Sequence, residues 1–139
     1  MVYVLIVDDD EDDRDLFCEA VNIVDPSIGC IMARNGEEAL EGLKRQDLHI
    51  PDIIFLDPNM PRLNGMQCLR ALKKDSLFEH IPVVIYTTSK LKEDKKAAMQ
   101  GGAADFVTKP TSVKELCETI AGILVDQGIL THTPPDIDC

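Results

Sequence analysis

Five polar side chains that could do chemistry together each stand at the end of a short apolar run. They are Asp8, Asp9, Asp57, Thr87 and Lys109. Clustered carboxylates repel one another and ionise fully only beside a cation, and Mg²⁺, which prefers oxygen ligands, suits them. An amine and a hydroxyl at the same place could hold the oxygens of a phosphoryl group, which makes Asp57 a candidate nucleophile. These residue types therefore point to Mg²⁺-assisted transfer of a phosphoryl group onto a carboxylate.

Alternating apolar runs and amphipathic stretches predict the elements that must position these side chains. Strands are expected at residues 2–7, 29–33, 52–56, 82–86 and 105–108. Helices are expected over residues 11–24, 35–46, 64–73 and 93–100, and from Ser112 onward. Five strand–helix repeats with short loops predict a parallel sheet covered by helices on both faces. Because ligands of such sheets bind outside the carboxyl ends of the strands, the five side chains should converge at one edge.

The first predicted helix carries an apolar side and an acidic start. It is expected to bury Leu16, Ala20 and Ile23 on one face, with Phe17, Val21 and Val24 beside them. Asp10, Asp12 and Asp13 lie at its start, where acidic side chains suit the helix dipole. We expect these three to be ordinary helix charges.

Four segments of the sequence resemble the receiver domains of bacterial two-component systems. They are VLIVDDD at the start, PDIIFLDPNMPRLNG around Asp57, IPVVIYTTS around Thr87 and GAADFVTKP at Lys109. The order and spacing of the segments make the match specific over roughly residues 2–126. The resemblance implies an α/β, flavodoxin-like doubly wound fold, with a five-stranded parallel sheet in the order 2-1-3-4-5 and five helices on both faces. It places the receiver domain at residues 1–127, followed by a loose C-terminal tail at 128–139.

The same resemblance implies a metal site and a phosphoacceptor. Asp57 is similar to the residue that takes the phosphoryl group in this family. Asp8 and Asp9 resemble the acidic pair that binds Mg²⁺, with Asp57 as a further ligand. The backbone carbonyl of Asn59 would complete the protein ligands.

Three further residues resemble the parts of the family that respond to phosphorylation. Thr87 is similar to the switch hydroxyl, and Lys109 to the lysine that holds a phosphoryl oxygen. Phe106 stands where the family places an aromatic side chain whose rotamer follows phosphorylation, although it lacks the hydroxyl of the commoner tyrosine. The Lys109–Pro110 bond is often cis in this family, which would aim the lysine.

One residue departs from the family pattern. Pro58 follows the predicted phosphoacceptor, and proline lacks the backbone N–H that helps to hold the phosphoryl group in other members. We expect a less stabilised phosphoryl group or an altered lifetime. By resemblance, Asn59 and Ser89 occupy positions that tune the access of water and hence the rate of hydrolysis.

The resemblance implies a regulatory switch rather than an enzyme with a separate substrate. The phosphoryl donor would be a sensor histidine kinase or a phosphotransfer protein. The chain would catalyse only its own phosphorylation and slow dephosphorylation. Phosphorylation would remodel the surface formed by the fourth helix, fifth strand and fifth helix, so the output would be contact with a downstream protein, dimerisation or phosphoryl relay.

Length and charge exclude several other classes of protein. The 139 residues suit one globular domain, with 45% hydrophobic and 28% charged residues. A net charge of −11 argues against nucleic-acid binding, because phosphate backbones repel it. No apolar run approaches the roughly 20 residues of a membrane span, and the N-terminus does not resemble a signal peptide. A cytoplasmic location without membrane contact is therefore expected.

The cysteines are expected to stay reduced. Their number is odd, no two form a CxxC pair, and three fall on apolar faces of predicted helices. We therefore expect small hydrophobic side chains in a reducing compartment rather than a disulfide framework or a zinc site. The cysteines are Cys18, Cys30, Cys68, Cys117 and Cys139.

A calcium-binding loop would also explain part of the acidic run. Four acidic side chains have the spacing of EF-hand ligands, namely Asp8, Asp10, Asp12 and Glu19. However, Asp13 stands where that loop needs a glycine, and a β-rich run precedes it where a helix belongs. The receiver hypothesis is therefore preferred.

A phosphatase or a degenerate receiver could carry some of the same side chains. A phosphatase could use Asp8 as nucleophile and Asp10 as acid, but the sequence lacks an acidic pair after Lys109 and a cap domain. The phosphatase and receiver hypotheses differ in which aspartate carries the phosphoryl group. A degenerate receiver that only docks partners would not need the intact set of five site residues.

Overall fold

The structure is a computed structural model that describes residues 1–61 and 63–131, and strands alternate with helices along it. The strands are β1 (Tyr3–Val7), β2 (Gly29–Ala33), β3 (Ile53–Leu56), β4 (Val83–Thr87) and β5 (Asp105–Thr108). The helices are α1 (Glu11–Val24), α2 (Gly36–Lys44), α3 (Gly65–Lys74), α4 (Lys92–Gln100) and α5 (Val113–Asp126). Each lies within one or two residues of its predicted place. No helix in the described ranges is long and apolar enough to cross a membrane.

The five strands form one parallel sheet in the order β2-β1-β3-β4-β5. Val7 at the end of β1 pairs with Ala33 on one side and Leu56 on the other. Thr87 pairs with Thr108 in the same way. This order confirms the predicted doubly wound, flavodoxin-like fold. The residues that follow these strands emerge together at one edge of the sheet.

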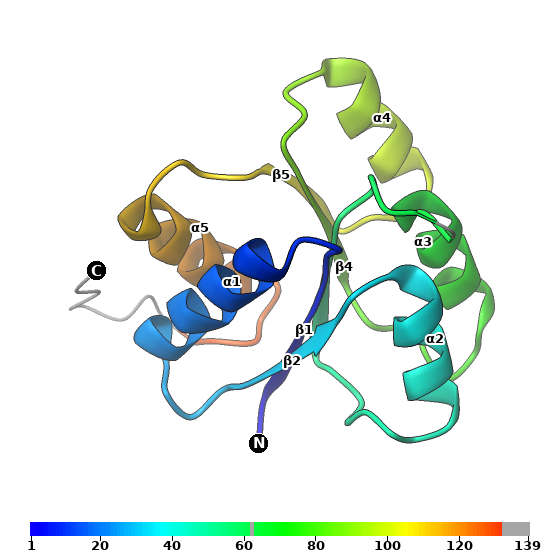
Figure 1. Ribbon diagram of the computed structural model, residues 1–139, viewed down its shortest axis with the longest axis horizontal. Coiled ribbons are helices and arrows are strands. Elements are labelled where there is room, and N and C mark those ends of the chain that lie inside the picture. The colour runs from blue at the N-terminus through cyan, green and yellow to red at the C-terminus, as the bar shows by residue number, and fades with distance from the viewer. Residues whose placement is uncertain (62, 132–139) are drawn as a thin grey trace.

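Helices cover both faces of the sheet, so the core has two parts (Figure 1). Helices α1 and α5 lie on one face, and α2, α3 and α4 lie on the other. Leu56 belongs to the core cluster under α2 and α3, whereas its neighbour Phe55 belongs to the cluster under α1 and α5. Side chains alternate between the faces in this way along a strand. All four residues of β3 are buried, so the strand that leads to Asp57 is held from both sides.

Helix α1 starts directly after the acidic run at the end of β1. The side chain of Asp10 caps it by accepting a hydrogen bond from the N–H of Asp13 at 3.1 Å. Its buried residues are Phe17, Ala20, Val21 and Val24. The prediction that Leu16 is buried is wrong, because its side chain is 37% exposed. The buried stripe runs through Phe17 instead, which packs against Phe55 of the sheet.

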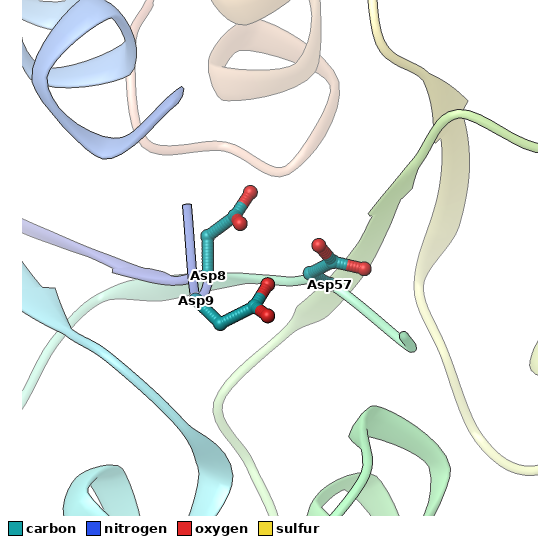
Figure 2. A group of neighbouring side chains, drawn as sticks. All are labelled: Asp8, Asp9 and Asp57. Atoms are coloured by element: carbon teal, nitrogen blue, oxygen red, sulfur yellow. The ribbon is translucent and has the colours of Figure 1, made fainter. Parts of the chain in front are cut away.

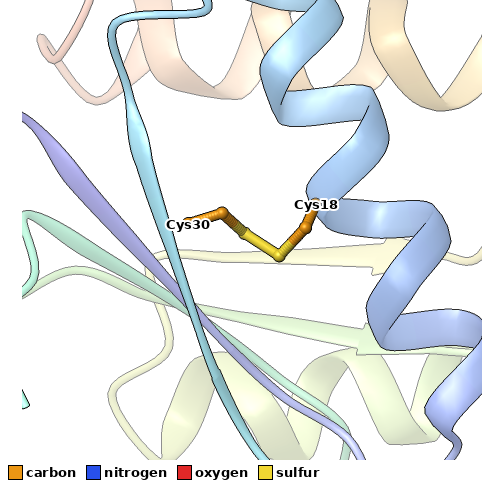
Figure 3. The surroundings of a disulfide bond; sticks show 2 residues. All are labelled: Cys18 and Cys30. Carbon is orange, nitrogen blue, oxygen red and sulfur yellow. A yellow bond between two sulfur atoms is a disulfide. The ribbon is translucent and has the colours of Figure 1, made fainter.

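Two cysteines form a disulfide, contrary to the sequence prediction (Figure 3). Cys18 of α1 is bonded to Cys30 of the edge strand β2. The packing of α1 against β2 brings their Cα atoms to 5.6 Å, a separation that a disulfide spans. The pair escapes sequence analysis because this contact depends on how a helix packs against a strand. Cys68 and Cys117 are not part of a disulfide and are buried, as predicted, and Cys139 lies outside the described residues.

The chain after α5 folds back onto that helix. The N–H groups of Ile129 and Leu130 donate to the carbonyl of Leu124 at 2.8 and 3.0 Å. Both side chains pack against the core cluster under α1 and α5. The segment predicted to be a loose tail therefore begins with packed residues, and 132–139 lie outside the described part of the chain.

Candidate functional site

Backbone hydrogen bonds between strand ends fix the site residues at one edge of the sheet. The N–H of Asp57 donates to the carbonyl of Val7 at 2.9 Å, which ties the end of β3 to the end of β1. The N–H of Lys109 donates to the carbonyl of Thr87 at 2.6 Å, which ties the end of β5 to the end of β4. The site side chains therefore start from backbone that the sheet itself positions.

Three carboxylates meet at this edge (Figure 2). Asp8 and Asp9 follow β1, Asp57 follows β3, and each offers an oxygen that lies within 4.8 Å of the others. Asp8 is fully buried and Asp57 is 6% exposed, whereas Asp9 is exposed. Oxygen donors at this spacing fit a hard divalent cation such as Mg²⁺, whose charge would offset their mutual repulsion. The exposed Asp9 leaves a side through which an ion could enter.

The ammonium group of Lys109 is shared among carboxylates. Its Nζ lies 2.7 Å from Asp8 Oδ2, 2.8 Å from Asp13 Oδ2 and 3.4 Å from Asp57 Oδ2. The centroid of the Tyr86 ring lies 5.4 Å from Nζ, within the range of a cation–π contact. The side chain of Lys109 is only 11% exposed, so these partners hold it inside the site.

Two features of this lysine were not predicted from the sequence. The Lys109–Pro110 peptide bond, whose isomer the sequence left open, is trans, and ion pairs hold the lysine in place. Asp13, expected to be an ordinary helix charge, is an ion-pair partner of Lys109. The two residues are 96 positions apart, so their contact exists only in the folded chain. The one sequence signal that could have suggested it is that Asp13 lies a helical turn beyond the acidic pair.

Burial and hydrogen bonding act in opposite directions on the charges of the site. Burial raises the pKa of Asp57 to about 6, although the hydrogen bond from the N–H of Asn59 at 2.8 Å and the charge of Lys109 act against the rise. For Lys109, burial alone would lower the pKa, but its hydrogen bonds to Asp13 and Asp8 outweigh burial and hold the pKa above its usual value. Lys109 therefore stays protonated at neutral pH. Added positive charge near Asp57 would stabilise its ionised carboxylate.

In metal-free buffer, Asp57→Asn is expected to raise the free energy of unfolding at neutral pH by about 1–2 kcal/mol. Folding raises the pKa of Asp57 from 3.8 to about 6, so the folded protein retains a proton that the unfolded chain loses, and stability falls as pH rises through this range. Asparagine carries no charge, so the gain should be absent below pH 3.8 and complete above about 6. Urea denaturation with a chelator across this pH range measures it. No gain at neutral pH would contradict the prediction.

Thr87 and Phe106 line a cavity beside the site. Thr87 is fully buried, and its Oγ1 accepts a hydrogen bond from the N–H of Ser89 at 3.1 Å. The cavity has a volume of about 210 Å³ and is also lined by Pro58 and by Ala98 of α4. The half-buried ring of Phe106 therefore borders free space next to Thr87.

Gly65, at the start of α3, lets the helix approach the backbone of the phosphoacceptor candidate. A Cβ at this position would lie 2.5 Å from the carbonyl oxygen of Asp57 and 2.5 Å from Cα of Pro58. Both atoms belong to the backbone, so no flexible side chain can move aside, and the capping box between Asn64 and Gln67 fixes the start of the helix. Glycine is therefore required for this approach.

Gly65→Ala is expected to lower the free energy of unfolding by roughly 2–3 kcal/mol, because backbone atoms must move to admit the methyl group. Gly122→Ala in α5 is the matched control, since a Cβ there meets nothing within 4 Å. It should leave stability unchanged or raise it by up to about 1 kcal/mol. Chemical denaturation compares the two variants, and equal effects would refute the close approach.

The geometry rules out the calcium-binding loop. Asp12 and Glu19 lie within the single continuous helix α1, which begins at Glu11. Asp8 lies at the end of a strand rather than in a loop between two helices. These acidic side chains therefore do not form a loop that surrounds one ion.

Comparisons with known proteins agree with this arrangement. The profile of the response regulator receiver domain family matches residues 4–121. The polar-differentiation response regulator DivK of Brucella anthropi is 37% identical over 123 residues, which cover 88% of this chain and 96% of DivK.

Two solved structures share the fold over nearly the whole chain. The phosphorylated cyanobacterial phytochrome response regulator RcpA has a TM-score of 0.83 at 27% identity and covers 97% of this chain and 99% of its own. The Mn²⁺-bound form of the response regulator Rcp1 has a TM-score of 0.81 at 27% identity, with coverage of 98% and 100%. Given the family match across most of its length, this chain belongs to the response regulator receiver domains, the regulatory modules of two-component signalling.

Proposed function

We propose that this protein is a phosphorylation-dependent switch that accepts a phosphoryl group on Asp57 with the help of Mg²⁺. The observation that carries the proposal is the meeting of Asp8, Asp9 and Asp57 within 4.8 Å, with the Lys109 ammonium 3.4 Å from Asp57. Acidic ligands for a cation and a fixed positive charge are what a carboxylate nucleophile needs to accept a dianionic group.

The phosphoryl transfer follows from the positions of these side chains. A carboxylate oxygen of Asp57 attacks phosphorus, and the bond from phosphorus to the leaving oxygen of the donor breaks with its electron pair on the donor. Lys109 and Thr87 would hold two of the phosphoryl oxygens by donating hydrogen bonds. Hydrolysis later adds water to phosphorus, breaks the bond to Asp57 and releases phosphate. Both steps depend on positioning and charge neutralisation.

The metal would be held by the carboxylates of Asp8, Asp9 and Asp57 and by the backbone carbonyl of Asn59. A bound Mg²⁺ supplies positive charge that offsets the charge of the incoming phosphoryl group. The buried Asp8 also accepts a hydrogen bond from the N–H of Asp10 at 3.0 Å, which fixes its orientation. The similar protein Rcp1 has been solved in a Mn²⁺-bound form, which supports the binding of a divalent cation by this chain.

The switch would work by favouring one arrangement of the residues beside the cavity. A phosphoryl group that accepts a hydrogen bond from Thr87 in only one of two positions would stabilise that position. The cavity of about 210 Å³ would let the Phe106 ring change its rotamer at the same time. The surface of α4, β5 and α5 would change as a result. This surface is our candidate contact for a downstream protein or a second copy of the chain.

Partners and boundaries complete the proposal. The donor would be a sensor histidine kinase or a phosphotransfer protein, and the receiver unit would comprise residues 1–127. We assign no role in nucleic-acid or membrane binding, because the net charge is −11. A cytoplasmic location and a regulatory role, limited to self-phosphorylation and slow dephosphorylation, belong to the same proposal.

Incubation with acetyl phosphate tests the proposal directly. With Mg²⁺, the full chain should acquire an alkali-labile phosphoryl group on the peptide that contains Asp57, and a chelator should prevent it. The same protein should change its hydrodynamic size or its interaction with a cognate kinase when beryllofluoride, a phosphoryl mimic, is added with Mg²⁺. Failure of the chain to take either group would refute the proposed function.

Pro58→Met is expected to slow dephosphorylation roughly 2- to 10-fold, since the new backbone N–H can donate to a phosphoryl oxygen. In the present chain the next N–H, that of Asn59, already donates to Asp57 Oδ1. The measurement is the decay of the labelled protein after removal of the donor. Pro61→Met, a change of the same kind at an exposed site in the same loop, is the control. Indistinguishable decay in the two variants would remove the idea.

A further inference from the structure

The ion pair between Asp13 and Lys109 is a contact that the proposed phosphoryl transfer does not use. Asp13 lies in the first turn of α1, and its Oδ2 accepts a hydrogen bond from Lys109 Nζ at 2.8 Å. A first-turn acid usually interacts with the helix end. This one instead reaches the residue that follows β5, so it acts on the lysine of the site.

The three hydrogen bonds of the lysine are unequal. The two short ones, 2.7 Å to Asp8 and 2.8 Å to Asp13, lie on the side of β1 and α1, and the contact with Asp57 is longer at 3.4 Å. An ammonium group has three N–H donors, so all of them are directed at these carboxylates. In this state the lysine is held mainly by partners other than the phosphoacceptor.

The third donor faces Asp57 at the longer distance of 3.4 Å, so for Lys109 to hold a phosphoryl oxygen there, Nζ would have to move away from at least one partner of its two short bonds. The carboxylate of Asp8 is fully buried, so removal of its partner would leave a buried charge. The side chain of Asp13 is 38% exposed, so water can replace the lysine there at lower cost. The bond to Asp13 is therefore the one expected to give way.

We propose that Asp13 is a positioning residue that competes with the phosphoryl group for Lys109 and so weakens binding of that group. The inference rests on the proposed function of Asp57. Two effects of Asp13 both weaken binding of the phosphoryl group. Asp13 occupies a donor of Lys109, and its negative charge repels an incoming dianion. The contact thereby sets how strongly the site holds a phosphoryl group, without touching it.

Binding of beryllofluoride at saturating Mg²⁺ measures this competition by calorimetric titration of the full chain. Asp13→Asn is expected to bind beryllofluoride about 3- to 5-fold more tightly than the parent, the range of a part-exposed ion pair. Asp13→Glu keeps the charge and should bind within about twofold of the parent. Asp12→Asn removes an exposed charge from the same helical turn and is the matched control, also expected within about twofold.

Mg²⁺ affinity without beryllofluoride separates competition from a general change in the site. Loss of a nearby negative charge should leave Mg²⁺ binding unchanged or slightly weaker in both asparagine variants. Only Asp13→Asn should combine this with tighter beryllofluoride binding, a pattern that loosened packing would not produce. Equal beryllofluoride affinities of Asp13→Asn and Asp12→Asn, or weaker binding by Asp13→Asn, would overturn the role of Asp13 alone. A parent protein that binds no beryllofluoride would overturn the proposed function as well.

Discussion

Asp57→Asn is expected to reduce labelling by acetyl phosphate at least about 100-fold, because a neutral amide cannot replace the carboxylate nucleophile. The substitution keeps the shape of the side chain, and the backbone bond from residue 57 to Val7 does not depend on it. The loss should therefore be chemical rather than structural. Quantification of acid-stable, alkali-labile phosphate on the intact chain, with and without Mg²⁺, measures the effect.

Two other aspartates make the result decisive. Asp52 is exposed and precedes β3, at the opposite end of this strand from Asp57. Asp52→Asn should therefore be labelled as well as the parent. Asp8→Asn should still label, more slowly, because it would lose a metal ligand but not the nucleophile. If Asp8→Asn abolished labelling while Asp57→Asn retained it, the phosphatase hypothesis would replace the receiver mechanism.

Lys109→Gln is expected to lower the free energy of unfolding by about 2–4 kcal/mol at neutral pH in metal-free buffer. The change removes the cation from a group of carboxylates that includes the fully buried Asp8 and the nearly buried Asp57. These charges would then be buried without a partner and would repel one another. Urea denaturation with a chelator measures the loss.

The size of this loss should depend on charge rather than on packing. Lys114→Gln, at an exposed position of α5, makes the same change in net charge and should cost little. Adding Mg²⁺ or lowering the pH should recover part of the stability of Lys109→Gln, since either reduces the uncompensated negative charge. Equal stabilities of the two glutamine variants would show that Lys109 does not hold the cluster together.

The fold could be predicted from local signals in the sequence. The helix at Glu11–Val24 has the predicted bounds because Asp10 caps its start and Asp25 precedes a proline at its end. The buried strand Ile53–Leu56 shows as an unbroken apolar run. Such signals depend on neighbouring residues. The burial of Leu16 was wrongly predicted because it depends on how α1 is rotated against the sheet, which neighbouring residues do not determine.

The site could be predicted only as far as strand ends define it. Asp8, Asp57 and Lys109 each follow a strand of one parallel sheet, so the topology places them at the same edge, where the structure brings them together. Asp13 and the disulfide of Cys18 with Cys30 arise from the packing of α1 on other elements. These contacts join residues that come close only in the folded chain, so their spacing along the sequence does not predict them. Whether Thr87 and Asn59 act as proposed stays a prediction.

The two sides of the charge cluster differ in burial, and under the proposed function this difference would decide which side moves on phosphorylation. Asp57 is rooted in a strand whose residues are all buried, whereas every residue of the edge strand before Lys109 is only half-buried. Less buried segments open at a lower free energy, so a phosphoryl group between the two sides would displace β5 more readily than β3. A conformational change that starts at Asp57 would therefore appear at the edge strand β5, where another protein could bind.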